Sequence, residues 1–504
     1  MAKLVIKRLL LAALALVLLL AIALAVNTWR QGSRQLQVAP LAPVAVDAKA
    51  AAESLAAAVR FKTASGLLDP QGQAEAFAGL REHLKQSYPL VHERLKLETV
   101  NRDTLVYTWT GSDPQARPIA LLAHQDVVPI APGTEALWKQ PPWDGRIADD
   151  HVWGRGAWDN KGNLVSQLEA AELLLKSGFQ PRRTVVLIFG HDEEIGGRRG
   201  ALAVVELFKQ RGVRFEAVLD EGLLVTMGIL KGIEAPIALV GVSEKGYLSV
   251  QLSVQGTPGH SSMPPAPGQG AIGVLSAALA KLDANPMPGG ISGIAGEMFS
   301  VLAPEMQGLQ RVVLSNLWLT APIVERTLSG SASTNALIRS TTALTVVRAG
   351  QVDNVLPGLA EAVVNFRLLP GDTDATVLAH IKRVVADERV QAKVMPGWGE
   401  TSPVSSSTSP FYKAVERSVR EVFPGTVVAP GLMLGGTDAR HFAPIADDIY
   451  RFSPVRATAD DLKRFHGTDE RISIANFVEM IRFYHRLLQL AAGAEGAAAV
   501  ASSK

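Results

Sequence analysis

The sequence predicts an α/β protein with a largely parallel sheet flanked by helices, into which an α+β domain is inserted. Apolar runs at 118–123, 184–189 and 217–219 have the composition of strands buried on both faces. Helical patterns separate these runs, and such alternation is typical of a parallel sheet. At 247–256 apolar and polar residues alternate, as in a half-exposed antiparallel strand. We therefore expect two kinds of architecture in one chain.

A chain of 504 residues is too long for one typical core, so two or three domains are expected. Changes in composition indicate a hydrophobic N-terminal segment, a tether, a main domain in two parts, a domain inserted between these parts, and a disordered tail. The segment is 1–30, the tether 31–50, the main domain 51–245 and 401–490, the inserted domain 246–400, and the tail 491–504.

Apolar periodicity predicts the remaining elements of the main domain in order. Two helices and a β-hairpin precede the first buried strand, and a helix that stops near Gly178 follows it. Another helix follows the second buried strand, and two more lie in the C-terminal part. The helices are expected at 51–60, 73–86, 163–176, 200–210, 411–422 and 473–490, and the hairpin strands at 95–100 and 104–109.

The inserted domain is expected to contain helices at 270–282 and 376–387 and strands at 341–348 and 362–368. Residues 289–335 of this domain are apolar and partly helical. We expect this segment to be core or packing surface, and a lipophilic lid is the alternative.

The N-terminus carries an uncharged apolar run at 9–26, preceded by Lys3, Lys7 and Arg8. Its 18 residues just reach the length that spans a bilayer. The basic flank should stay in the cytoplasm, which leaves the rest of the chain outside, in the periplasm or the extracellular space. Residues 23–25 could be a signal-peptidase site, in which case the protein is secreted. The length of the run favours an uncleaved membrane anchor.

Composition excludes several classes of site. The chain has no cysteine, so disulfides, thiolate nucleophiles and cysteine-based zinc sites are impossible. A net charge of +2 without a basic stripe gives no reason to expect nucleic acid.

Histidines and acidic residues follow each buried strand. His124 follows the first strand, Glu193 and Glu194 follow the second, and Asp220 directly ends the third. Ligand sites in parallel sheets lie beyond the carboxyl ends of the strands, so residues that are distant in sequence can meet there. Asp159, in a glycine-containing loop before a helix, and the late His466 complete the candidate ligand set.

This set contains nitrogen and oxygen ligands without a thiolate, which suits two divalent metal ions, Zn²⁺ first, with Mn²⁺ or Co²⁺ possible. A carboxylate shared by both ions would hold them about 3.5–4 Å apart, as in two-metal hydrolases. Glu193, next to a ligand but spare, is the natural general base. Asp220 is preferred to its neighbour Glu221 because Asp220 ends the strand, and Glu221 remains the alternative.

Five motifs occur in a fixed order between about residues 50 and 490. They are His124-x-Asp126, Gly156-Ala157-x-Asp159-x-Lys161-Gly162, Asp192-Glu193-Glu194-x-Gly196-Gly197, Leu219-Asp220-Glu221-Gly222 and the late His466. Together they resemble the aminoacylase/carboxypeptidase S-like metallopeptidases of the acetylornithine deacetylase and succinyl-diaminopimelate desuccinylase superfamily. The hydrophobic N-terminus and the long insertion are similar to the exported or anchored branch. That branch includes carboxypeptidase S and the enzyme that joins and splits fatty acids and amino acids.

The resemblance implies a zinc-peptidase-like catalytic domain and an inserted lid and dimerisation domain. It makes the candidate set the metal ligands, with Asp159 bridging, Asp126 orienting His124, and Glu193 as the base. His260 resembles the lid histidine that stabilises the developing oxyanion, often across a homodimer. The residues similar to those that hold the substrate carboxylate are Asn354, Arg367, Thr437 and Arg440.

The activity implied is hydrolysis of the amide bond of N-acyl amino acids, or of peptides with a free C-terminal carboxylate. A metal-bridged hydroxide would attack the amide carbonyl while Glu193 takes its proton. The alternatives are a strict carboxypeptidase or dipeptidase, and an anchored binding protein with a degenerate metal site.

Overall fold

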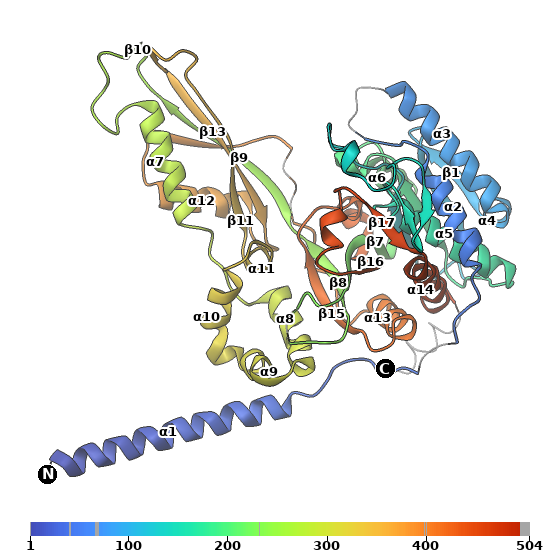
Figure 1. Cartoon of the computed structure of the whole chain (residues 1–504), viewed down its shortest axis with the longest axis horizontal. Helices are drawn as coiled ribbons and strands as arrows, with labels where there is room; N and C mark the ends of the chain where they lie inside the picture. The colour runs from blue at the N-terminus through green and yellow to red at the C-terminus, as the bar shows by residue number, and fades with distance from the viewer. Residues whose placement is uncertain are drawn as a thin grey trace.

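The structure is a computed structural model that describes residues 2–39, 42–65, 70–230, 232–397, 399 and 401–493. It consists of a main domain, a lid domain that projects from it, and a long N-terminal helix (Figure 1). The predicted disordered tail, 491–504, overlaps the end of the last helix, and its residues from 494 onward lie outside the described part.

The main domain is built on an eight-stranded sheet with the order β1-β2-β6-β3-β7-β16-β8-β15. The neighbours β6–β3, β3–β7, β7–β16 and β8–β15 are parallel, and the hairpin β1–β2 forms an antiparallel edge. The predicted α/β class is therefore confirmed. The strands are β1 (Lys96–Val100), β2 (Thr104–Trp109), β3 (Ile119–His124), β6 (Val185–Gly190), β7 (Phe215–Thr226), β8 (Ile237–Glu244), β15 (Val427–Met433) and β16 (Ala446–Ala457).

Both faces of this sheet are buried, which explains why its central strands are continuous apolar runs. Successive side chains of β3 point to opposite faces: Ile119 and Leu121 join one core, whereas Ala120 and Leu122 join the other. The first core includes α2 (Ala48–Val59), α5 (Lys161–Lys176), α13 (Pro410–Val422) and α14 (Ile474–Ala492), and the second includes α6 (Ala201–Gln210) and the 3-10 segment η4 (Asp438–Ile445).

Further helices and a small sheet complete the main domain. The helices α3 (Pro70–Ser87) and α4 (Pro89–Arg94) precede the hairpin. A small antiparallel sheet has the order β17-β5-β4, and its strands come from distant parts of the chain. They are β4 (Arg146–Ala148), β5 (His151–Trp153) and β17 (Arg471–Ser473).

The lid domain has an antiparallel sheet with the order β11-β13-β9-β14. Alternate residues of β9, from Leu248 to Val254, are buried under two helices, as the period-two pattern predicts. At the far tip, the short strand β10 pairs with β12 (Figure 1). The elements are β9 (Gly246–Gln255), β10 (Gly259–His260), β11 (Thr341–Ala349), β12 (Val355–Leu356), β13 (Leu359–Leu368), β14 (Val390–Val394), α7 (Ala271–Ala284) and α12 (Asp374–Val385).

The apolar segment 289–335 does not join the lid core. Met298 and Phe299 of α8 (Gly293–Leu302) pack instead against Val427 and Ala429 of β15, at the edge of the main sheet. The expected inserted domain, 246–400, therefore contributes to both bodies, because α8 covers apolar strand surface outside the lid. The next helices are α9 (Gly308–Ser315), α10 (Leu317–Leu328) and α11 (Ala332–Ile338). The first two leave large apolar side chains exposed, among them Leu309, Trp318 and Ile323.

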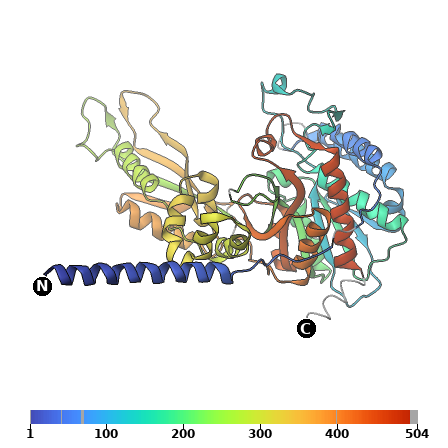
Figure 2. The ribbon, with the colours of Figure 1, turned by 60° about the horizontal axis from the view of Figure 1, so that its bottom comes forward.

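The helix α1 (Ala2–Arg30) is the one described helix that is long and apolar enough to cross a membrane. It lies beneath the lid domain in Figure 2. Its last turns are bound to α9, because the Asn27 side chain donates to the Ser315 carbonyl at 2.7 Å. The expected tether is also bound: the Gln35 amide donates to the carbonyl of Val428 at 2.9 Å and accepts from its N–H at 2.7 Å. Residues 31–39 thus follow the open edge of β15.

Candidate metal centre

The candidate ligands meet at the carboxyl ends of the central strands, as the topology predicts. His124 is the last residue of β3, and Glu193 and Glu194 lie in the short 3-10 turn η2 (Glu193–Ile195) that follows β6. Asp159 lies just before α5, and His466 lies in the loop before β17. Four loops or strand ends therefore bring these side chains to one place.

Asp159 lies between the two histidines. Its Oδ1 is 3.2 Å from His124 Nε2, and its Oδ2 is 2.8 Å from His466 Nε2. The second histidine is also 3.5 Å from Glu194 Oε2. A carboxylate in this position can offer one oxygen to each of two cations, which is the geometry expected of a bridging ligand.

The structure brings Glu221, rather than Asp220, to this cluster. Glu221 Oε1 lies 3.0 Å from His124 Nε2. Asp220 instead accepts hydrogen bonds from the N–H groups of Glu221 and Ala439, both at 2.8 Å. The reason is that β7 does not end at Asp220: it continues to Thr226, and consecutive strand residues point to opposite sides. The register with β16 slips between Asp220 and Leu223, a bulge that leaves Glu221 unpaired.

Two overlapping groups of side chains have the spacing of metal ligands. One is His124, Glu193 and Glu221, and the other is His124, Asp159 and Glu194. Within each group, ligand atoms lie within 4.8 Å of one another. His466 contacts the second group through Asp159 and Glu194.

Asp126 holds two parts of the centre together. Its Oδ1 lies 3.4 Å from His124 Nδ1, and the Nδ1 atom also contacts the Asp126 carbonyl at 2.8 Å. The same carboxylate accepts the N–H groups of Glu193, at 3.2 Å, and of Glu194, at 3.1 Å. Asp126 therefore fixes the ring of His124 and the turn that carries both glutamates.

The centre has an excess of negative charge. Burial raises the pKa of Glu193 and of Glu221 well above the ordinary range, and neighbouring carboxylates add to both shifts. Burial likewise raises the pKa of Glu194. Hydrogen bonds to Asp159 and Glu194 raise the pKa of His466 to about 10. Each shift favours a proton at this place, so the site stabilises added positive charge.

Divalent cations fit this arrangement. The Glu194 Oε1 atom is buried and accepts no hydrogen bond within the described part of the chain, so its lone pairs are free for a cation. The donors are imidazole nitrogens and carboxylate oxygens, which suit zinc, manganese or cobalt.

Residues expected to bind the substrate lie in separate places. Thr437 donates from its N–H and its hydroxyl to buried Glu244, at 3.2 and 2.9 Å. Arg440 donates to the Gly196 carbonyl at 3.2 Å, which places it beside the glutamate turn. Arg367 lies in the lid sheet, where its guanidinium stacks 4.8 Å from the ring centre of Tyr247.

His260 and Asn354 lie together at the lid tip, where the N–H of Ser261 donates to the Asn354 carbonyl at 3.0 Å. Both residues are exposed, and the tip projects away from the main domain (Figure 1). His260 contacts Ser262 Oγ at 2.8 Å. Within one chain, the structure does not bring these two residues to the metal centre.

Several residues that support the site have no role assigned to them from the sequence. Glu470 is fully buried and binds the loop of Asp159, although its position four residues after His466 was a possible signal. Lys161 is also buried, and its ammonium donates to the Ala58 carbonyl at 3.1 Å, which ties α5 to α2. Asp192 accepts the N–H groups of Arg199 and Gly200 before α6.

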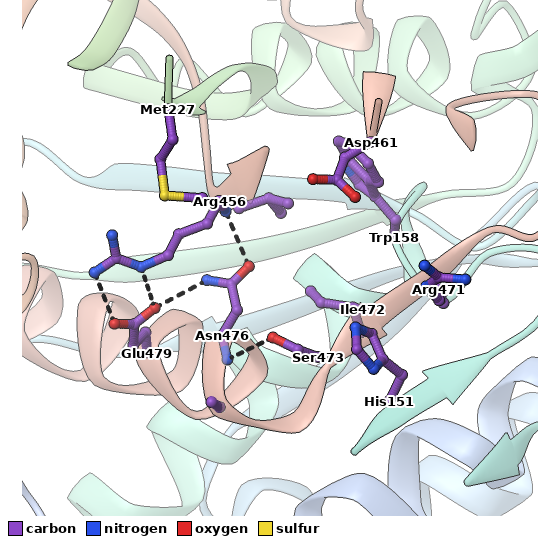
Figure 3. A pocket seen from close by; sticks show the side chains of 12 residues that line it. His151, Trp158, Met227, Arg456, Asp461, Arg471, Ile472, Ser473, Asn476 and Glu479 are labelled. Atoms are coloured by element: carbon purple, nitrogen blue, oxygen red, sulfur yellow. Dashed lines mark hydrogen bonds and ion pairs between the residues drawn. The ribbon is translucent and has the colours of Figure 1, made fainter. Parts of the chain in front are cut away.

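A cavity of about 320 Å³ is lined by residues that lie close in sequence to two of the candidate ligands (Figure 3). Trp158, the neighbour of Asp159, and Asp461, in the loop leading to His466, line it together with residues of β16, β17 and α14. None of the candidate ligands lines this cavity. Its wall includes Arg456, which is held by Glu479 at 2.7 and 2.8 Å.

Comparison with known proteins identifies the family. The sequence profile of peptidase family M20/M25/M40 matches residues 120–490. The chain belongs to this family. It is 40% identical over 476 residues to the probable carboxypeptidase S-like 2 of Dictyostelium discoideum, covering 92% of this chain and 91% of that protein. It is 39% identical over 440 residues to the N-fatty-acyl-amino acid synthase/hydrolase PM20D1 of Xenopus tropicalis, covering 87% and 85%.

Solved structures of M20 proteins share the fold. The metallo-carboxypeptidase Sso-CP2 of Sulfolobus solfataricus aligns with a TM-score of 0.60 at 19% identity, covering 87% of this chain and 98% of that one. The YXEP protein of Bacillus subtilis, described as a dinuclear metal binding peptidase from the M20 family, aligns with a TM-score of 0.52 at 18% identity, covering 88% and 99%. The resemblance found in the motifs is therefore confirmed at the level of family and fold.

Proposed function

We propose that this M20 enzyme hydrolyses the amide bond of N-acyl amino acids at a centre of two divalent cations, most simply zinc. The observation that carries the proposal is Asp159, held between His124 and His466 with Glu193 and Glu194 in the adjoining turn. The high identity to proteins named as carboxypeptidases and as N-fatty-acyl-amino acid synthase/hydrolases supports this substrate class.

The proposed ligands are His124, Asp159, Glu194, Glu221 and His466, with Asp159 shared. Glu221 replaces Asp220 in this set because it faces His124. When bound, the cations supply Lewis acidity, which polarises an amide carbonyl and makes water a stronger acid.

Glu193 acts as the general base and then as the general acid. It takes a proton from the attacking water and delivers this proton to the amide nitrogen as the C–N bond breaks. Its N–H is held by Asp126, so the side chain starts from a fixed backbone position. Burial of Glu193 suits this role, because the raised pKa makes the carboxylate a stronger base.

The free carboxylate of the substrate is proposed to bind to arginine. Arg367 stacks on Tyr247 and makes no ion pair within the described residues, so its guanidinium is available to a carboxylate. Arg440, beside the glutamate turn, and Thr437, at the start of η4, are proposed to contribute from the main domain. Asn354, at the lid tip, is proposed to contribute to the site of a second subunit.

His260 is proposed to act on the site of a second subunit. The exposed lid tip is remote from the centre of its own chain, which supports a homodimer in which each tip reaches the partner's cleft. The imidazole would donate a hydrogen bond to the oxyanion as it develops.

The N-terminal helix is proposed to place the enzyme outside the cytoplasm. Its run 9–26 is apolar on all sides and exposed apart from half-buried Leu24, as a membrane anchor or an export signal requires. The basic residues before the apolar run favour the orientation in which the main domain is exported.

The variant Glu193→Gln tests the assignment of the base. We expect kcat to fall by about 10²–10⁴-fold while two metal ions per chain remain bound. Glu169→Gln is the matched control, because Glu169 is a partly buried glutamate of α5 that is hydrogen-bonded to Tyr88 outside the cluster. Unchanged turnover of Glu193→Gln would contradict the proposal.

A strict carboxypeptidase or dipeptidase is the second candidate, since relatives of both kinds share the fold. Competition of N-lauroyl amino acids against short peptides in one assay distinguishes them. Preferential cleavage of the lauroyl substrates supports the acylase, and cleavage of the peptides alone supports the peptidase.

A further inference from the structure

Two buried side chains outside the ligand set connect the loops that carry Asp159 and His466. Arg155 and Glu470 form an ion pair whose side chains are 2% and 0% exposed. Neither residue is one of the proposed ligands, yet each makes hydrogen bonds to the backbone of a loop that bears a ligand. A buried pair of charges is costly to maintain unless its remaining hydrogen-bonding capacity is used. Here five hydrogen bonds go to the two loops, and Arg155 Nε has no partner among the described residues.

Glu470 binds the Asp159 loop. Its Oε1 accepts three backbone N–H groups: those of Gly156 and Trp158 at 2.9 Å and that of Asp159 itself at 3.0 Å. Its other oxygen, Oε2, accepts from Arg155 Nη1. Three N–H bonds to one carboxylate oxygen fix the turn of the chain immediately before the bridging ligand.

Arg155 binds the His466 loop. Its Nη2 donates to the carbonyls of His466, at 3.2 Å, and Gly467, at 2.9 Å. The backbone of His466 has φ of 56°, a left-handed conformation that a histidine adopts only when its surroundings hold it. The bonds from Arg155 are part of what holds it, because they fix the carbonyl on its C-terminal side.

The two loops are joined to the same pair of strands, β5 and β17. Strand β17 begins directly after Glu470, and β5 ends two residues before Arg155, with Arg471 opposite Trp153. Trp158 packs on Phe465 with ring centres 6.1 Å apart, and Phe465 stacks on the imidazole of His466 at 4.4 Å. The ion pair therefore completes a rigid connection between the backbone of Asp159 and the ring of His466.

We propose that Arg155 and Glu470 are positioning residues that set the separation of Asp159 and His466 and so preform the metal centre. The inference rests on the proposed function, because it requires that these two residues are metal ligands. It predicts that loosening the pair changes metal affinity and metal geometry, and not only the stability of the fold.

The test is Glu470→Gln, which preserves shape but removes the charge that pairs with Arg155. The control is Glu421→Gln, because Glu421 forms a buried pair of the same kind with Arg486, between α13 and α14. Metal affinity is measured by competition with a chelator, geometry by the visible spectrum of the cobalt-loaded protein, and stability by thermal unfolding. Kinetics then separate kcat from KM.

We expect Glu470→Gln to weaken metal binding by about 10–100-fold and to change the cobalt spectrum. At saturating metal, kcat should fall while KM stays within about twofold, because the proposed carboxylate-binding residues are untouched. Glu421→Gln should lower the unfolding temperature without changing the metal affinity or the spectrum.

Wild-type affinity and spectrum in Glu470→Gln would overturn the inference, even if the variant were less stable. If Glu470→Gln does not fold, Arg155→Lys decides, since lysine keeps the charge but cannot donate to Glu470 and to both carbonyls in the same fork geometry. The inference then requires Arg155→Lys to alter the cobalt spectrum, and an unaltered spectrum overturns it. A wild-type protein that binds no divalent metal would instead refute the proposed function.

Discussion

Replacing Asp220 and Glu221 one at a time by the corresponding amide tests which of the two is the metal ligand. Glu221 Oε1 lies 3.0 Å from His124 Nε2, whereas Asp220 is engaged by two backbone N–H groups. The variants Glu221→Gln and Asp220→Asn each remove one charge and keep the shape of the side chain. Their effects should therefore differ in kind.

For Glu221→Gln we expect the loss of one cation. Changes to residues that merely orient ligands cost about 10–100-fold in metal affinity, so removal of a direct carboxylate should cost at least about 100-fold at one of the two positions. A factor of 100 corresponds to about 2.7 kcal/mol. Activity should fall with metal occupancy and recover in part when the metal concentration is raised.

For Asp220→Asn we expect a loss of stability instead. The amide nitrogen cannot accept the hydrogen bond of one of the two N–H groups, which leaves a buried donor unpaired at a cost of about 1–3 kcal/mol. Metal analysis after dialysis should still find two ions per chain. The assignment is refuted if Asp220→Asn binds one ion and Glu221→Gln binds two.

Three further predictions concern His466, the lid tip and the edge strand β15. Metal affinity should rise with pH by about tenfold per pH unit for each proton that the metal displaces. The reason is that the pKa of His466 is raised to about 10, so its imidazole is protonated at neutral pH before the metal binds. Calorimetric titrations with metal at pH 6 and pH 8 measure the change in affinity, and equal affinities would contradict the prediction. Inactive His260→Ala and Glu193→Gln proteins, when mixed in equal amounts and allowed to exchange subunits, should recover about a quarter of wild-type activity. Half of the dimers are then heterodimers, and each heterodimer has one site with both Glu193 and the partner's His260. No recovery in a verified heterodimer would exclude the action of His260 on the site of the other subunit. Gln35→Ala should destabilise the main domain by about 1–3 kcal/mol, because it leaves the N–H and carbonyl of Val428 without their partner. Chemical unfolding measures the change, and Gln37→Ala, at an exposed position, is the control. Equal effects of the two variants would contradict the stabilising role of the Gln35 hydrogen bonds to β15.

The sequence predicts the place of the centre well, because the position depends on strand ends. A run of apolar residues that stops at a histidine or an acid marks a carboxyl end, and the structure has His124 at the end of β3 and Glu194 in the turn after β6. The same rule misled at Asp220, since β7 continues through a bulge in which Gly222 has φ of 143°. A bulge reverses which side chain faces the ligands, and no pattern of apolar residues shows it.

Other features could not be predicted because they depend on packing between distant segments. The burial of Glu470 requires the β17–β5 ladder, which joins residues more than 300 positions apart. The helix α8 has an apolar composition that would suit either domain, and only the open edge of β15 decides that it covers the main sheet.

The carboxylates of the centre fall into two groups with different partners. Asp126, Asp192 and Glu470 accept backbone N–H groups and thereby fix the loops that carry the ligands. Among the described residues, no backbone N–H group donates to the side chains of Glu193, Glu194 and Glu221, and burial raises the pKa of all three. Hydrogen bonds stabilise the first group, with the ion pair to Arg155 in addition at Glu470, whereas bound cations would stabilise the second group. If cations bind Glu194 and Glu221 as proposed, Glu193 remains as the carboxylate that can exchange a proton with the substrate.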